Sequence, residues 1–292
     1  MQIFFQQLVN GIALGSIYAL VALGYTMVYG TIRLINFAHG DIFMVGAFFG
    51  FYSVSQLGMN VYLAMLLAMI FSSILGVIIE RIAYKPLRRS TRVAALITAI
   101  GVSFLLQNAM IAFVGPEVKA FPSTITNSIF RVFGIVFNTK HILVLVITVL
   151  LMILLQVIVK YTKMGKAMRA VAVDAEAAQL MGINVDRVIS FTFAIGSGLA
   201  GIAGVLVGVY YNSVSPTMGV TYGLKAFVAA VVGGVGSIPG AMVGGYLIGV
   251  LETLVTVLGL STYREAAVYG LLIVILLVLP AGLFGKNVKE KV

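Results

Sequence analysis

Long stretches without a charged residue constrain the fold of this chain more than any other feature of its sequence. Asp, Glu, Lys and Arg are absent from residues 1–32, 42–79, 93–116, 142–159, 188–224, 226–251 and 266–285. A helix needs about 20 apolar residues to cross the hydrocarbon core of a bilayer. Each run can therefore hold one spanning helix, and the longest can hold two.

The composition supports a membrane protein and excludes several other classes. Hydrophobic residues make up 61% of the 292 residues and charged residues only 10%, whereas soluble domains carry roughly 25% charged residues. A soluble enzyme, a disordered tail, a coiled coil and a disulfide scaffold do not fit this balance. The chain has no Cys, which removes thiol catalysis and Cys-based metal sites.

The runs predict an all-α polytopic membrane protein, a single transmembrane domain over residues 1–292 with eight or nine spanning helices. Helices are expected near 5–31, 34–55, 61–80, 93–114, 141–160 and 188–211, then a glycine-broken pair at 224–236 and 239–258, and a last helix at 265–284. The count is eight if the first half of the broken pair re-enters the membrane, and nine if it crosses. The first apolar run is too long for a signal peptide and lacks a basic flank, so we expect it to be retained.

The basic residues predict the orientation, because Lys and Arg accumulate in cytoplasmic loops. Most of them fall in four segments that would share the inside: Arg33; Arg81, Lys85, Arg88, Arg89 and Arg92; Lys160, Lys163, Lys166, Arg169 and Arg187; and Lys286, Lys289 and Lys291. The N-terminus is then outside, and the C-terminal tail is inside provided that both halves of the broken pair cross. The net charge of +10 is therefore a topology signal, and no nucleic-acid partner is expected.

The longest segment expected outside is residues 115–140. Its alternating part puts Ile129, Arg131, Phe133 and Ile135 on one side and Phe130, Val132 and Val136 on the other. This alternation fits a short hairpin on the membrane surface. An ordered surface loop is the alternative that we favour, because a hairpin needs more than alternation.

The inside segment 160–187 is rich in Ala and charged residues between Gly165 and Gly182, which favours a helix. An apolar stripe recurs at helical spacing: Met164, Met168, Val171, Ala175 and Ala178. The stripe predicts one short amphipathic helix that ends at Gly182. Spacing alone fits equally a helix that rests on lipid and a helix that docks on a cytoplasmic partner.

Glycine spacing gives the next prediction. GxxxG pairs at Gly11–Gly15, Gly46–Gly50, Gly204–Gly208, Gly240–Gly244 and Gly245–Gly249 predict close helix packing. The sequence GGVGSIPG at 233–240 differs, because its glycines and proline interrupt a helix. Broken helices of transporters lie beside the pathway, so we expect a translocation route along Gly233, Gly234, Gly236, Ser237, Pro239 and Gly240. A tight outer hairpin is the alternative.

A second candidate for the pathway is RLINFAHGD at 33–41, near the inner end of the second helix. Asn36, His39 and Asp41 are polar or ionisable, and such groups in a span usually face protein or water. If the stretch is helical, Asn36 and His39 share a face. A polar helix start at the interface, in which Arg33 and Asp41 offset each other, is the alternative.

Motifs for catalysis and cofactor binding are missing or out of context. Gly196-x-Gly198-x-x-Gly201 lies inside an apolar span without a preceding strand, so it is not a dinucleotide site. The sequence contains no GxxxxGK[ST], so the chain has no phosphate loop for ATP. With two His and no HExxH, no metal ion, no cofactor and no catalytic residue are expected.

These residues resemble a known family. GIALGSIYALVALGYTMVYGTIRLINFAHGDIFMVGAF at 11–48, the segment at 165–206 and the segment at 223–249 are similar to the branched-chain amino acid ABC transporter permeases, specifically the shorter of the two permease types. INFAHGD is the most specific tract. The likeness covers nearly the whole chain.

The resemblance implies a subunit of an importer for Leu, Ile and Val in the bacterial cytoplasmic membrane, with urea or short amides as alternative cargo. It implies a second homologous permease, two cytoplasmic ATP-binding subunits and an extracytoplasmic substrate-binding protein as partners, beside the lipid. Glu176-Ala177-Ala178 followed by Gly182 resembles the EAA-x3-G loop of ABC importers, and SFTF at 190–193 departs from the fuller pattern. The ATPase would then dock on Gly165, Met168, Arg169, Ala175, Glu176, Ala177, Ala178 and Gly182.

A rival class is a self-sufficient ion-coupled carrier or channel. Such carriers place ionisable groups deep in their spans. Only Glu252 is expected at depth, since Asp41, Glu80 and Glu265 lie near helix ends. The sequence therefore gives little support to ion coupling.

Overall fold

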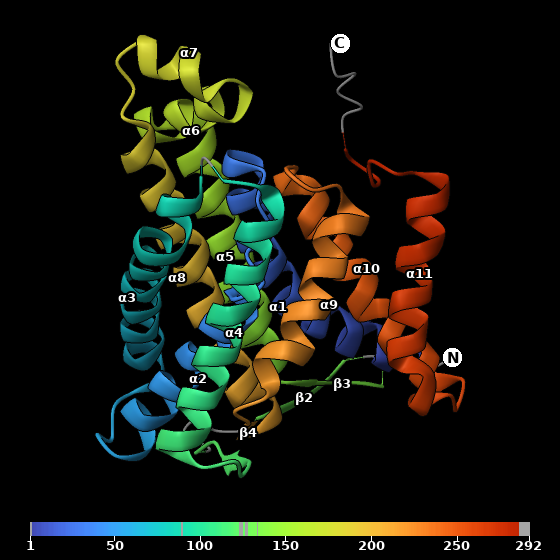
Figure 1. Ribbon diagram of the computed structural model, residues 1–292. Coiled ribbons are helices and arrows are strands. Elements are labelled where there is room, and N and C mark those ends of the chain that lie inside the picture. The colour runs from blue at the N-terminus through green and yellow to red at the C-terminus, as the bar shows by residue number, and fades with distance from the viewer. Residues whose placement is uncertain (1, 89, 123–124, 126–127, 133, 286–292) are drawn as a thin grey trace.

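The fold is known from a computed structural model, which describes residues 2–88, 90–122, 125, 128–132 and 134–285 and is dominated by helices (Figure 1). The main helices are α1 (Gln2–Ile32), α2 (His39–Ser55), α3 (Val61–Ile79), α4 (Arg92–Val114), α5 (Thr139–Tyr161), α8 (Val185–Tyr211), α9 (Met218–Gly233), α10 (Ile238–Val257) and α11 (Arg264–Val278). Shorter elements are α6 (Lys163–Val173), α7 (Ala175–Leu180), the π-helix η1 (Glu80–Tyr84), and the 3₁₀-helices η2 (Lys85–Leu87) and η3 (Ser261–Tyr263). The strands are β1 (Lys119–Ala120), β2 (Ile129–Val132), β3 (Ile135–Asn138) and β4 (Ser213–Val214).

The helices match the expected membrane architecture. Within the described residues, seven helical segments are long and apolar enough to cross a membrane: α1, α3 continued by η1 and η2, α4, α5, α8, α10, and α11 together with η3. The remaining two expected helices are present but shorter, since α2 has 17 residues and α9 has 16. The prediction of an all-α polytopic membrane protein is confirmed.

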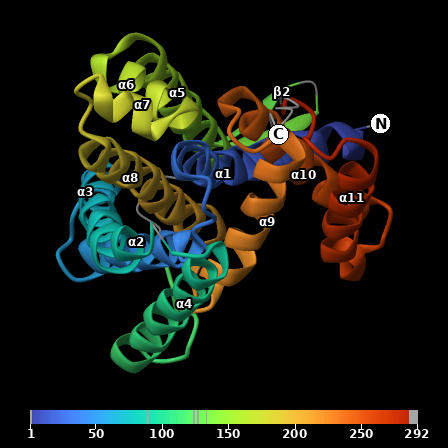
Figure 2. The ribbon, with the colours of Figure 1, turned by 45° about the horizontal axis from the view of Figure 1, so that its top comes forward.

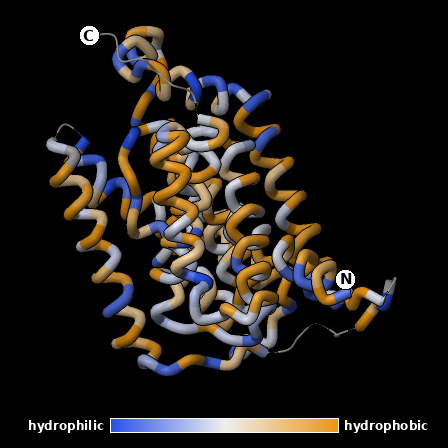
Figure 3. The backbone as a smooth tube through the Cα atoms, turned by 90° about the vertical axis from the view of Figure 1, so that its right-hand side faces the viewer, coloured by the Kyte–Doolittle hydropathy of each residue, from blue (hydrophilic) through white to orange (hydrophobic). Residues whose placement is uncertain are grey.

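The core of the bundle lies around α1 and α8, which are almost wholly buried and lie among the other helices in Figure 2. A helix that is apolar on all sides is expected in such a position. α4 and α11 lie at the periphery, where few of their residues are buried. Hydrophobic colour runs along the helices in Figure 3, as a lipid-facing surface requires.

Glycines set the closest helix contacts. Gly15 of α1 packs on α10, where a Cβ on Gly15 would lie 2.9 Å from the carbonyl oxygen of Gly245. Gly201 of α8 packs on α3 in the same way, 2.7 Å from the carbonyl oxygen of Ala68. The predicted packing role of the GxxxG pairs is therefore confirmed at the contact between Gly15 and Gly245. Gly201 lies outside those pairs and belongs to the discarded GxGxxG motif.

The strands lie at one end of the bundle, and α6 and α7 lie at the other (Figure 1). β2 and β3 form an antiparallel hairpin with Ile129 opposite Asn138, and β1 pairs with β4. The predicted hairpin is confirmed and the plain loop that we favoured is wrong, because β2 and β3 pair fully. Phe133, named in the alternating pattern, is outside the described residues.

The broken pair runs along the bundle twice, since α9 leads from the strand end to the α6 end and α10 returns (Figure 1). Phe284 N–H donates to the carbonyl oxygen of Gly233 at 2.9 Å, which holds the last described residues at the α6 end. This arrangement matches the crossing of both halves, rather than a re-entrant first half. The expected inner basic residues Arg89, Lys286, Lys289 and Lys291 are outside the described residues.

The second helix begins later than the sequence predicts. α2 starts at His39 rather than near residue 34, so Asn36 is not on its helical face. Arg33 has a φ of +53°, a left-handed conformation that ends α1. The irregular backbone after it contains the buried residues Asn36 and Ala38, and irregular backbone is tolerated in a membrane where protein covers it.

Candidate functional site

Gly165 sets the corner between α5 and α6. Its N–H donates to the Thr162 hydroxyl oxygen at 3.0 Å, which caps the start of α6. A Cβ on Gly165 would overlap the carbonyl oxygens of Ile158 and Val159, so glycine lets α6 turn back on the end of α5. The Arg169 guanidinium also donates to the carbonyl oxygen of Val159, one of the last carbonyls of α5, which have no partner within the helix. Both residues fix α6 on the bundle.

Asp174 divides the predicted amphipathic helix in two. Its backbone is extended, with φ −153° and ψ 111°. Its carboxylate accepts from the N–H groups of Glu176 and Ala177, both at 2.9 Å. The prediction of one helix between Gly165 and Gly182 is wrong, because the Asp174 side chain offers the backbone an N-cap that starts a new helix.

Gly182 closes α7 as the sequence predicts. Its φ is +83°, and its N–H donates to the carbonyl oxygen of Gln179 at 3.0 Å. Ile183 N–H donates to the carbonyl oxygen of Ala178, also at 3.0 Å. These two bonds make the Schellman motif that glycine favours.

α7 and the residue after it present apolar side chains to the exterior. Met168, Val171 and Ala178 are buried, whereas Ala175, Glu176 and Ala177 are exposed. Two large apolar side chains beside them are almost fully exposed, Leu180 at 89% and Met181 at 83%. In Figure 1 α7 projects beyond the ends of the long helices. An exposed apolar surface at such a place is typical of an interaction site.

The break at 233–240 is a tight turn at the α6 end. Gly234 and Gly236 have φ values of +104° and +91°, and Ser237 Oγ accepts from Gly240 N–H at 3.2 Å to start α10. Gly236 lies against Gly30 of α1. A cavity of about 90 Å³ separates the turn from α6 and is lined by residues of both. The structure thus brings the break and the predicted docking loop together.

The polar residues at the start of α2 lie elsewhere. His39 is fully buried, with its ring 4.7 Å from that of Tyr25 between centroids, and it packs on Gly24 of α1. The break instead meets α1 at Gly30, six residues and about 9 Å further along that helix. Asn36, 2% exposed, accepts from the Tyr84 hydroxyl at 2.9 Å, which fixes the irregular segment to η1. The structure does not bring the two predicted parts of the pathway into contact.

An ionic cluster that sequence reasoning missed joins η1 and η2 to α8. Glu80 is fully buried and pairs with Arg88. Ser190 donates to the second Glu80 oxygen at 2.6 Å. Arg88 also pairs with Asp186 at 2.6 Å, as does Lys85 at 2.7 Å. Glu80 and Arg88 are eight residues apart, beyond the spacing of three or four that brings side chains together on a helix, and Asp186 is distant in sequence, so no local spacing indicated this cluster.

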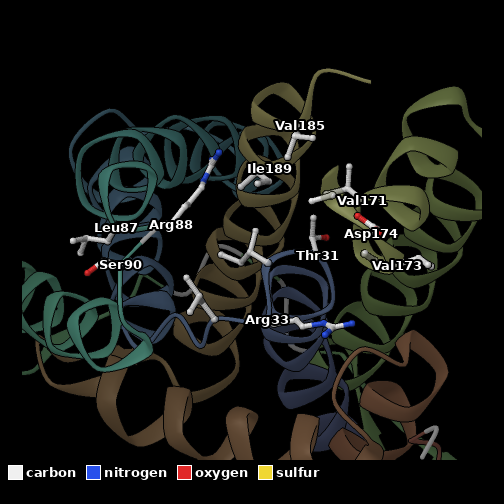
Figure 4. A pocket seen from close by; sticks show the side chains of 14 residues that line it. Thr31, Arg33, Leu87, Arg88, Ser90, Val171, Val173, Asp174, Val185 and Ile189 are labelled. Carbon is white, nitrogen blue, oxygen red and sulfur yellow. The ribbon is translucent and has the colours of Figure 1, made fainter. Parts of the chain in front are cut away.

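This cluster borders a cavity of about 540 Å³ at the α6 end (Figure 4). Its lining residues come from the end of α1 (Thr31 and Arg33), from beyond η2 (Arg88), from α6 and its end (Val171 and Asp174), and from α8 (Val185 and Ile189). The cavity is therefore shared by four segments that meet only at this end of the bundle. A shift of α6 relative to α1 would change its shape.

Glu252, the deep carboxylate of the ion-coupled alternative, is paired. Its Oε1 accepts from Lys225 at 2.6 Å and its Oε2 from the Tyr18 hydroxyl at 2.6 Å. Glu252 is 3% exposed and Lys225 is 9% exposed. Both carboxylate oxygens are therefore engaged in holding α1, α9 and α10 together. A carboxylate that is satisfied in this way is a poor candidate for an ion carrier.

Comparison with known proteins decides the family. The chain matches the family described as branched-chain amino acid transport system, permease component, over residues 7–278. It belongs to this family. The permease is 43% identical to the high-affinity branched-chain amino acid transport system permease protein LivH of Escherichia coli over 302 residues, covering 99% of this chain and 98% of the relative.

Two further relatives agree. The permease is 44% identical to the high-affinity branched-chain amino acid transport system permease protein BraD of Pseudomonas aeruginosa over 301 residues, covering 99% of this chain and 98% of that one. The solved structure of PsaBC from Streptococcus pneumoniae in complex with Fab covers 97% of the permease and 94% of its own chain, with a TM-score of 0.52 and 12% identity. The resemblance inferred from the sequence is confirmed, and the likeness to PsaBC shows the fold alone.

Proposed function

We propose that the permease is the membrane-spanning subunit of an ABC importer that carries branched-chain amino acids across the bacterial cytoplasmic membrane. The family match over residues 7–278 carries this proposal, together with relatives of 43–44% identity that extend over nearly the full chain. The chain is not an enzyme. Its sequence lacks a phosphate loop, so ATP is hydrolysed by partner subunits.

The partners of this importer are a second homologous permease, two cytoplasmic ATP-binding subunits and an extracytoplasmic substrate-binding protein. The exposed surface of α7 supports docking of an ATP-binding subunit, because Leu180 and Met181 are apolar and Glu176 is accessible. Between the two readings left open by the sequence, a docking helix is favoured over one lying on lipid. α7 projects beyond the long helices in Figure 1.

Movement would pass from the docking loop to the spans through α6. α6 is fixed to α5 by Gly165 and Arg169 and borders the turn at 233–240 across a small cavity. Closure of the ATP-binding subunits would tilt α6 and shift the turn against Gly30 of α1. Rocking of packed bundles of this kind opens a central route alternately to each side.

The other cargo and mechanism are less well supported. Urea and short amides would need a permease of the same family, yet the relatives described above are named for branched-chain amino acids. An ion-coupled carrier that used Glu252 would need this carboxylate to be available, and Glu252 is engaged with Lys225 and Tyr18.

Co-purification tests the proposed function directly. The permease is extracted from its native membrane in mild detergent, and the proteins that co-elute are identified by mass spectrometry. Recovery of a second permease and of a subunit with GxxxxGK[ST] is expected, followed by ATP-dependent leucine uptake in proteoliposomes. Recovery of the permease alone, with uptake that needs no ATP, would overturn the proposal.

Glu176→Arg is expected to lower ATP-dependent uptake at least about tenfold, while the subunit stays in the membrane. The substitution places a longer, positively charged side chain on the accessible face of α7, where it would disrupt the complementarity with the ATP-binding subunit. The matched control is Glu117→Arg, which makes the same charge change at an exposed residue of the strand end. Uptake and ATPase stimulation of Glu176→Arg at the level of Glu117→Arg would contradict docking through α7.

A further inference from the structure

A cavity of about 200 Å³ opens between α4 and α9, with the first turn of α2 behind it. Asp41, Ser103 and Gln107 make its polar part, and Ile100, Phe104 and Leu224 contribute to its apolar part. The three apolar side chains are exposed, so they form the mouth. The cavity thus combines an anionic group with an apolar rim.

The carboxylate of Asp41 is only partly satisfied. Its Oδ2 accepts from the Ser103 hydroxyl at 2.5 Å, and Gln107 donates to the Ser103 oxygen at 2.9 Å. Its Oδ1 is buried and has no hydrogen-bond partner among the described residues, and the whole residue is 2% exposed. A buried carboxylate oxygen without a donor is costly. A cationic group that donates a hydrogen bond to Oδ1 would satisfy this oxygen.

The cavity lies at mid-membrane depth. Ser103 is the central residue of α4, which runs from Arg92 to Val114. Few residues of α4 are buried, and Ser103, Gln107 and Asn108 put polar groups near its centre. Such groups face protein or water rather than lipid. The mouth between α4 and α9 is therefore on the side that a second permease subunit would cover.

We propose that this cavity binds amino acid cargo, with the ammonium group on Asp41 and the branched side chain against Phe104 and Leu224. An ammonium group offers three donors, enough for Asp41 Oδ1 and for a second acceptor. The apolar mouth suits a small aliphatic side chain, whereas urea has neither a cation nor such a chain. This proposal rests on the proposed function, since it takes a branched-chain amino acid as the cargo.

Uptake by the complete importer gives the first test. Asp41→Asn keeps the size of the side chain and an acceptor for Ser103, and it is expected to lower the leucine uptake rate at saturating binding protein at least about tenfold, the loss of one charged hydrogen bond. Glu117→Gln, the same change at an exposed outer residue, is the control and is expected to leave uptake unchanged. Equal leucine uptake by Asp41→Asn and Glu117→Gln would contradict the proposal that Asp41 binds the cargo.

Thiol labelling gives a readout that misfolding does not mimic. The chain has no Cys, so Phe104→Cys places one thiol of this subunit at the mouth. A cationic methanethiosulfonate should modify it several-fold faster than a neutral one of similar size, and Asp41→Asn should remove the difference. Leucine and isoamylamine should slow the modification, whereas isocaproate, which lacks the ammonium group, should not.

The outcomes separate the two proposals. If isocaproate protects as well as isoamylamine, or if Asp41→Asn leaves the reagent preference intact, Asp41 does not bind an ammonium group. If the wild-type importer takes up no branched-chain amino acid, the proposed function fails, and the preference for a cationic reagent still reports whether the cavity attracts cations.

Discussion

Gly249→Val will prevent α10 from packing on α1, and little folded permease will be recovered. A Cβ on Gly249 would overlap the backbone nitrogen and Cα of Gly15, and it would also crowd the carbonyl oxygen of Gly11 at 2.5 Å. These neighbours are backbone atoms of the most buried helix, so they cannot rotate away. Overpacking costs about 1–3 kcal/mol where side chains can yield, and more is expected here because the two helices must separate.

The measurement is the monodisperse fraction in size-exclusion chromatography after detergent extraction, with the thermal midpoint of any folded protein. The control is Gly270→Val in α11, since nothing lies within 4 Å of a Cβ at Gly270. Gly270→Val should be recovered at the wild-type level, within a few degrees in midpoint. If Gly249→Val is as stable as the control, α1 and α10 do not pack closely enough at Gly249 to exclude a larger side chain.

The helix framework could be predicted because charge-free runs and GxxxG spacing act through local rules. In lipid, an uncharged run such as 1–32 is expected to form a helix, because a helix satisfies its backbone hydrogen bonds within the segment. The spacing of Gly11 and Gly15 therefore predicted a close helix contact, and in the structure the contacting helix is α10. Which helix each glycine faces could not be predicted, because that depends on residues more than two hundred positions away.

Where the predictions failed, a polar side chain competed with regular structure. The apolar stripe from Met164 to Ala178 continues past Asp174, so its periodicity predicts one helix. The Asp174 carboxylate nevertheless caps the N-terminus of a second helix, α7. Likewise the predicted start at residue 34 ignored the left-handed backbone of Arg33 and the anchoring of Asn36 by Tyr84. Such choices depend on local hydrogen bonds, which a hydropathy pattern does not contain.

The candidate site was only half visible in the sequence. Asp41 stood out because an acidic residue is rare near an apolar run. Ser103 and Gln107 did not, since small polar residues inside the run 93–116 do not interrupt a spanning helix. Their significance comes from the hydrogen bond between Ser103 and Asp41, which joins α4 to α2. A polar residue at the centre of an otherwise apolar span was the signal that the sequence offered.

Lys225→Met is expected to destabilise the permease by about 3–5 kcal/mol, the usual cost of removing one partner of a buried ion pair. Glu252 is buried, and its Oε1 lies 2.6 Å from Lys225 Nζ. Without the lysine, the Glu252 carboxylate is left with the Tyr18 hydroxyl as its described donor, so it must remain charged at a high desolvation cost or take up a proton. The measurement is the free energy of unfolding, or the thermal midpoint, of the purified subunit in one detergent.

The double variant Lys225→Met/Glu252→Gln completes the test. Replacing both charges removes the uncompensated carboxylate, so most of the stability should return, and the coupling between the two sites appears as the departure from additivity. Glu265→Gln is the control, because Glu265 is exposed and lies 3.7 Å from Lys225, where an ion pair contributes about 0–1 kcal/mol. A single variant no less stable than Glu265→Gln would contradict a structural role for the pair.

The same double variant separates the two transport mechanisms. If the Glu252–Lys225 pair only joins helices, the double variant assembled with its partners should still take up leucine with ATP at close to the wild-type rate. If Glu252 carried a proton or a cation, uptake would be lost although stability had returned, because the uncharged glutamine amide can neither bind and release a proton nor pair with a cation as a carboxylate does. In the double variant, stability and uptake should therefore both be close to wild type if the pair only joins helices. If Glu252 couples an ion to transport, stability should return but uptake should not.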